Sequence, residues 1–186
     1  MSEQKKSNIC IATDALISAL LMALGFIFSW AIGTDFSGIA IGIVSVAVPV
    51  LIVLYAVFQK KLLLTVSLGI KAIIVGAGST VILKEVLEYH MLSLAGIVMA
   101  VLAAVLILAT VLSVKGLSYE RLGTKLIILL AVGTVAMGIN TYCSISSAIV
   151  LKELAGTMYY VSMVLQNLAD IFLWVAIILI GVLRKK

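Results

Sequence analysis

The chain has 186 residues, of which 64% are hydrophobic and 11% are charged, with a mean hydropathy of +1.32 and a single proline. Soluble domains average about 45–50% apolar and about 25% charged residues, so this composition excludes an ordinary soluble domain and indicates a membrane protein. Fourteen glycines and two cysteines also exclude a collagen-like chain and a disulfide scaffold.

Six apolar segments are each long enough to cross a bilayer, because a hydrocarbon core of roughly 30 Å needs about 20 apolar residues in a helix. Transmembrane β-strands alternate in polarity over about ten residues, whereas 98–112 is apolar at almost every position. The sequence therefore predicts an all-α membrane protein, a six-transmembrane-helix bundle of three helical hairpins, with 1–186 as a single integral membrane domain. The expected spans are 14–33, 38–58, 62–83, 91–114, 126–150 and 158–183.

The first span is expected to begin with Asp14 as a helix cap, since an acidic side chain there pairs with free N–H groups and complements the helix dipole. Its length favours a retained span over a cleaved signal peptide. Ala15, Ala19 and Ala23 follow at four-residue spacing, and small residues on one stripe allow a second helix to approach closely. We expect this face to dock on another helix of the chain; the alternative is a separate membrane protein.

The connections between the spans are short, and their charges indicate an orientation. The outer connections are expected at 34–37, 84–90 and 152–157, and the inner ones at 59–61 and 115–125. If the N-terminus is cytoplasmic, ten of the thirteen basic residues lie inside, as the positive-inside rule requires. Both termini are therefore expected in the cytoplasm, and the net charge of +5 needs no nucleic-acid partner. The ten are Lys5, Lys6, Lys60, Lys61, Lys115, Arg121, Lys125, Arg184, Lys185 and Lys186.

The third span contains a charge deep inside the expected membrane. Lys71 lies roughly 14 Å from the inner end of the span at 1.5 Å per residue. A charged side chain at the bilayer centre costs at least ~2.5–3.5 kcal/mol on insertion scales. We therefore expect Lys71 to turn away from lipid, toward a group of opposite charge.

The fifth and sixth spans contain polar stripes at a similar depth. Asn140 and Ser144 are one turn apart on the fifth span, and Gln166 and Asp170 are one turn apart on the sixth, with Asn167 beside them. Asp170 lies roughly 20 Å from the inner end of its span, within reach of a lysine on a tilted helix. Because an unsatisfied polar group in hydrocarbon costs several kcal/mol, the stripes are expected to converge.

Two interpretations of this polar interior follow. In the functional one, Lys71 binds a carboxylate or phosphate, while Asp170 carries a proton or holds a cation. In the other, the two residues form a buried ion pair that only fixes helix packing and register. The predicted substrate or ion site comprises Lys71, Asp170, Asn167, Gln166, Asn140 and Ser144.

The sequence contains few candidates for catalytic or metal-binding residues. His90 is the only histidine and is placed in an outer connection, so no Cys/His cluster has metal-ligand spacing. Cys10 and Cys143 are far apart in sequence and neither belongs to a CxxC motif. No GxSxG, HExxH or Walker motif is present. We therefore expect no catalytic activity, no metal and no cofactor.

The leading interpretation is a small transport protein, or the membrane subunit of a transporter, that handles a small polar solute or ion at the level of Lys71 and Asp170. Six spans, cytoplasmic termini, a small-residue face and a mass of 19.7 kDa resemble, in architecture, the substrate-binding subunits of energy-coupling vitamin transporters. The alternative is a non-catalytic assembly, immunity or regulatory partner; a membrane-embedded enzyme comes third. The expected location is the cytoplasmic membrane of a bacterium or archaeon, in contact with the lipid bilayer.

Overall fold

The computed structural model describes residues 3–33, 36–89, 94–118 and 122–183, and these ranges are helical apart from short connections. One long helix in it is broken at Gly156, where φ is 84° and ψ is 168°. Six segments of the described chain are long and apolar enough to cross a membrane, which confirms the predicted number. The helices are α1 (Glu3–Ala31), α2 (Phe36–Phe58), α3 (Lys61–Tyr89), α4 (Leu94–Lys115) and α6 (Thr124–Leu183), and α6 supplies two spans, an N-terminal half (Thr124–Glu153) and a C-terminal half (Gly156–Leu183).

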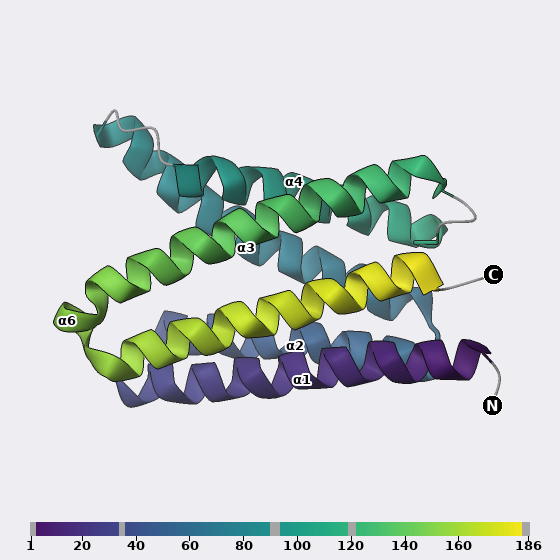
Figure 1. Cartoon of the computed structure of the whole chain (residues 1–186), viewed down its shortest axis with the longest axis horizontal. Helices are drawn as coiled ribbons and strands as arrows, with labels where there is room; N and C mark the ends of the chain where they lie inside the picture. The colour runs from purple at the N-terminus through teal and green to yellow at the C-terminus, as the bar shows by residue number, and fades with distance from the viewer. Residues whose placement is uncertain (1–2, 34–35, 90–93, 119–121, 184–186) are drawn as a thin grey trace.

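The spans run back and forth along one long axis (Figure 1). The start of α1 and the end of α6 lie at the same end of the bundle, and the Gly156 break lies at the other. Gln59, with φ of 55°, forms the tight turn between α2 and α3 at the end that holds the termini. This turn is where the sequence predicts it.

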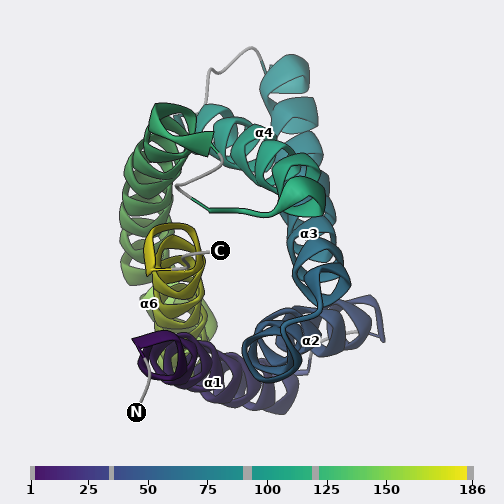
Figure 2. The same ribbon diagram turned by 90° about the vertical axis from the view of Figure 1, so that its right-hand side faces the viewer.

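Viewed along the axis, the helices form a closed ring (Figure 2). Each helix packs against the next one in the chain, and α6 returns to pack against α1, in the most extensive helix–helix interface of the part of the chain that the structure describes. The first and last helices are therefore neighbours. The hydrophobic core follows the inward faces of all the helices and includes Ile11, Ile52, Leu64, Leu102, Leu106, Leu173 and Ile177.

The outer surface of the ring is apolar. On α1, Leu16, Leu20, Leu24 and Ile27 are about half exposed and recur every three or four residues, so they form one outward stripe. A large exposed apolar surface on long helices is the surface that acyl chains cover. The chain is thus a polytopic integral membrane protein in contact with the bilayer.

The expected cap at Asp14 is wrong. α1 begins at Glu3, eleven residues earlier, so Asp14 lies inside a continuous helix. Interior N–H groups already donate to carbonyls four residues back, and they leave nothing for a capping carboxylate to accept. The polar residues before Asp14 extend the helix beyond the apolar span, which hydropathy alone does not register.

Two expected outer connections are largely helical. α3 continues to Tyr89, so 84–89 is helix where the sequence predicts a loop, in keeping with the helix-forming lysine, glutamate and leucine there. At 152–157 the connection is reduced to the break at Gly156, whose positive φ is accessible to glycine without a Cβ clash. Predicted features that lie outside the described residues are His90, Arg121 and the basic residues 184–186.

Candidate functional site

An ion pair joins α3 to the C-terminal half of α6. Lys71 Nζ lies 2.5 Å from Asp170 Oδ1. Each residue stands about halfway along its span, which places the pair near the middle of the membrane. The structure thus brings together the two charges that the sequence places at similar depths.

Lys71 faces into the ring. Its side chain is 8% exposed, whereas Val66 and Ile73 on the opposite side of α3 are exposed to the surroundings of the bundle. The lipid-facing stripe and the lysine are thus on opposite faces of the same helix. The free-energy cost of burying this charge is offset by the opposite charge of Asp170 on α6.

Asp170 is also on an inward face, but it is more accessible than its partner. Its side chain is 26% exposed, whereas the nearby Ala169 and Leu173 are buried. The outward face of this half of α6 is marked instead by Leu168 and Val175. At 100° per residue Asp170 points away from that outward face, so its exposed quarter faces the interior of the ring.

The pair retains hydrogen-bonding capacity. An ammonium group has three donors and a carboxylate has about four acceptor positions. Among the described residues, Lys71 Nζ donates only to Asp170 Oδ1, and the other carboxylate oxygen accepts no hydrogen bond. The two groups therefore have donors and an acceptor available to a solute or to water.

Asn167 joins the two halves of α6. Its Nδ2 donates to Ser144 Oγ and to the carbonyl oxygen of Met163, both at 2.8 Å. Asn140 lies one turn before Ser144, half-buried, and takes no part in these hydrogen bonds. Asn167 and Ser144 are thus bonded to each other. Asn167 is close to Asp170 in sequence, but it is not bonded to the ion pair.

Gln166 belongs to a different interface. Its Nε2 donates to Ser29 Oγ at 3.3 Å and to Ser162 Oγ at 3.1 Å, and Ser162 Oγ lies 2.9 Å from the carbonyl oxygen of Gly25. Ser29 and Gly25 are both on α1, so the carboxamide is engaged there and not with Asp170. The sequence places Gln166 and Asp170 on one stripe, but the structure gives them different neighbours.

These contacts belong to an antiparallel seam between α1 and α6 that the sequence analysis missed. On α1 the seam residues recur at alternating intervals of four and three, a heptad spacing that keeps one face of a helix against its partner. Ser18 Oγ donates to the carbonyl oxygen of Ala169 at 2.7 Å near the middle of the seam. The residues at this spacing, all of them buried or half-buried, are Ile11, Ala15, Ser18, Met22, Gly25 and Ser29 on α1, and Ser162, Gln166, Ala169, Leu173, Ala176 and Ile180 on α6.

The alanine face of α1 is therefore occupied within the chain. Ala15 and Ala19 are buried, whereas Ala23 is only half-buried. A strict four-residue spacing advances 400° per step and drifts by 40°, so Ala23 rotates away from the seam that begins at Ala15. The signal that identifies the seam is the heptad spacing of the small residues and not the four-residue alanine stripe.

Comparison with protein-family models, with curated proteins and with solved structures finds no match for this chain. The architectural resemblance to vitamin-transporter subunits thus gains no support from shared sequence or shared fold. The fold and the site define the class: a helical polytopic membrane protein with an ion pair inside its ring of helices.

Proposed function

We propose that this chain is a small membrane transport protein, or the membrane subunit of a transporter, that handles a small polar solute or ion at Lys71 and Asp170. The observation that carries the proposal is the inward-facing, partly accessible ion pair at mid-membrane depth. Asn167, Asn140 and Ser144 are proposed to shape its surroundings, whereas Gln166, which the sequence groups with them, is hydrogen-bonded toward α1 instead.

The position of the pair supports a functional role. A charge at this depth costs at least ~2.5–3.5 kcal/mol, and ionisable groups inside membranes mark solute, ion and proton pathways. A hydrophobic pair of similar volume often packs as well as a buried ion pair or better. A role in packing alone therefore does not explain why these two positions have a lysine and an aspartate and not two hydrophobic residues.

The available hydrogen-bonding groups suggest the chemistry. A solute carboxylate or phosphate fits the remaining donors of Lys71, and a proton or cation fits the second carboxylate oxygen of Asp170. Protonation of Asp170 weakens its hold on Lys71 and leaves the lysine free to bind an anion. Uptake of a proton and an anion together keeps the net charge of the site unchanged.

The proposed orientation places both termini in the cytoplasm. Lys60, Lys61, Lys115 and Lys125 lie at helix ends on the side of the bundle that also holds the start of α1. An excess of basic residues on one side favours the cytoplasmic leaflet. We propose the cytoplasmic membrane of a bacterium or archaeon as the location, and a role without catalysis, cofactor or nucleic acid.

Ligand-dependent thermal stabilisation of the purified chain tests this function. Unfolding temperatures are measured with acetate, phosphate, glycine and sodium chloride, and at least one probe is expected to give a saturable increase, because binding to the folded state alone stabilises it. Lys71→Met and Asp170→Asn, singly and together, are expected to abolish that increase. Lys61→Met, at the exposed start of the same helix, is the matched control and should retain it.

A folded double variant that keeps the increase would contradict a binding role for the pair. Mass spectrometry of small molecules that co-purify with the wild-type chain, and are lost from the double variant, would identify the solute directly.

A second candidate function is that of a non-transporting membrane partner. It is favoured by the hydrogen bonds that Ser18, Ser162 and Asn167 make within the chain, since these polar groups register helices and are not left for a solute. Its interface would have to use a surface other than the buried Ala15 and Ala19 face. Stoichiometric co-purification of another membrane protein in mild detergent, without any solute-dependent stabilisation, would support this alternative.

A further inference from the structure

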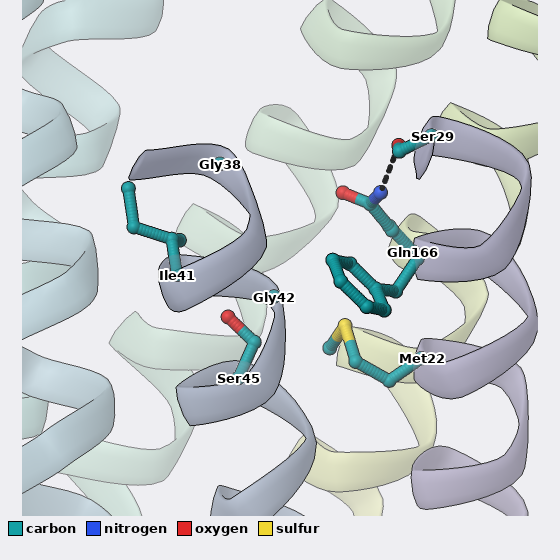
Figure 3. Close-up of a pocket in the computed structure, with 8 residues that line it drawn as sticks. Met22, Ser29, Gly38, Ile41, Gly42, Ser45 and Gln166 are labelled. Carbon is teal, nitrogen blue, oxygen red and sulfur yellow. Dashed lines mark hydrogen bonds between the residues drawn. The ribbon is translucent and has the colours of Figure 1, made fainter. Parts of the chain in front are cut away.

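A cavity lies between α1, α2 and the C-terminal half of α6, apart from the ion pair (Figure 3). Its volume is about 200 Å³, and Met22 and Phe26 of α1, Ser45 of α2 and Gln166 of α6 contribute to its walls. Neither Lys71 nor Asp170 lines it, and none of the lining residues that the structure describes is ionisable. The described part of its lining is therefore uncharged.

An aromatic wall is built into this cavity. A Cβ atom at Gly42 would overlap the ring of Phe26, so the glycine allows the ring to lie directly on the backbone of α2. The Met22 thioether lies on the same side of the cavity (Figure 3). A ring and a sulfur atom together favour a flat aromatic ligand, through offset aromatic and sulfur–aromatic contacts.

Gln166 Oε1 is an available acceptor in this cavity, and the Ser45 hydroxyl can both donate and accept. Because Gln166 Nε2 donates to Ser29 and Ser162, the carboxamide oxygen turns away from Ser29, toward the α2 side (Figure 3). Among the described residues this oxygen accepts no hydrogen bond, and neither does the Ser45 hydroxyl form one. Pro49 has no N–H to donate to the carbonyl oxygen of Ser45 four residues earlier in α2, so that acceptor lacks its usual helical partner.

We propose that this cavity binds a small neutral aromatic molecule with one N–H or O–H donor, which Gln166 Oε1 accepts. A cavity of about 150 Å³ accommodates benzene, so the space suffices for one or two fused rings. A charged ligand is disfavoured because the described lining residues supply no opposite charge. This binding site is separate from the proposed solute site and does not depend on transport.

Indole and benzofuran form a matched pair of probes, since they have nearly the same shape but only indole has a donor. Binding of radiolabelled indole is measured on the purified full chain, and an excess of unlabelled indole separates the saturable site from partition into detergent. We expect one saturable site per chain. Benzofuran is expected to compete roughly 2- to 10-fold less well, the ratio that corresponds to one net hydrogen bond.

Two variants test whether indole binds in this cavity. Gln166→Leu removes the acceptor and is expected to make indole and benzofuran compete equally. Ser45→Phe fills the cavity and is expected to abolish the saturable component, whereas Ser147→Phe, at an exposed position of α6, should retain it. The double variant Lys71→Met with Asp170→Asn should also retain it, which separates this site from the solute site.

No saturable binding to the wild-type chain, or equal competition by both probes there, would overturn the proposal. So would full binding in a folded Ser45→Phe variant. If that variant does not fold, the ratio of the two probes in Gln166→Leu decides: an unchanged preference for indole counts against the proposal.

Discussion

At the scale of single residues, the ion pair was predictable and the partners of the amides were not. Lys71 and Asp170 are charges in otherwise apolar spans, so counting residues from the span ends gives their depths, and similar depths predict a pair. Whether Gln166 contacts α1 or α3 depends on how α6 is rotated about its own axis. This rotation is set by packing around the ring. Span counting contains no information on that packing.

The stability of the ion pair is the first quantity to measure. Removing one partner leaves a buried charge without compensation, so Lys71→Met alone and Asp170→Asn alone are each expected to lower the free energy of unfolding by about 3–5 kcal/mol. The double variant should lose less than either single variant. A double-mutant cycle in detergent, with Lys61→Met as the control, measures this coupling. Additive losses would show that the two side chains do not stabilise each other.

At the scale of helices, the α1–α6 seam owes its close approach to small residues. A Cβ atom at Gly25 would lie 2.9 Å from Gln166 Cγ and 3.2 Å from the carbonyl oxygen of Ser162. The glycine thus brings the backbone of α1 close enough to accept the hydrogen bond from Ser162. The sequence shows a glycine in an apolar helix, but only the packing shows which helix lies against it.

Gly25→Ala is therefore expected to destabilise the protein, although alanine is the better helix former. Overpacking at such a contact typically costs about 1–3 kcal/mol, which exceeds the gain of up to ~1 kcal/mol in helix propensity. Gly138→Ala is the matched control, since nothing lies within 4 Å of a Cβ atom at that position of α6. Thermal unfolding should show a lower midpoint for the first variant and an unchanged or higher midpoint for the second. Equal changes in the unfolding midpoints of the two variants would contradict close packing of α6 on α1 at Gly25.

At the scale of the whole molecule, the number of spans follows from hydropathy, whereas closure of the ring does not. Long apolar runs specify that each helix crosses the membrane. Which helices are neighbours depends on contacts such as that between Ser18 and Ala169, which are 151 residues apart in sequence. The return of α6 to α1 is therefore a result that only the three-dimensional structure supplies.

The proposed orientation predicts which positions are accessible from outside the cell. In a background with Cys10→Ser and Cys143→Ser, a Thr157→Cys variant, next to the Gly156 break, should react with a membrane-impermeant maleimide in intact cells. With only Cys143→Ser in place, native Cys10 near the start of α1 should react only after the cells are permeabilised. The reverse pattern would place the termini outside and contradict the positive-inside assignment.

Closure of the ring by its last helix also has a consequence for biogenesis. Asp170 follows Lys71 by 99 residues, so at a ribosomal rate of about 5–20 residues per second the lysine waits roughly 5–20 s for its counter-ion to be synthesised. During that interval the nascent chain holds an uncompensated cation among lipids or insertion machinery. We therefore expect the chain to be most susceptible to degradation during its membrane insertion. A chain truncated before α6 is complete is expected to be a preferred target for membrane quality-control proteases.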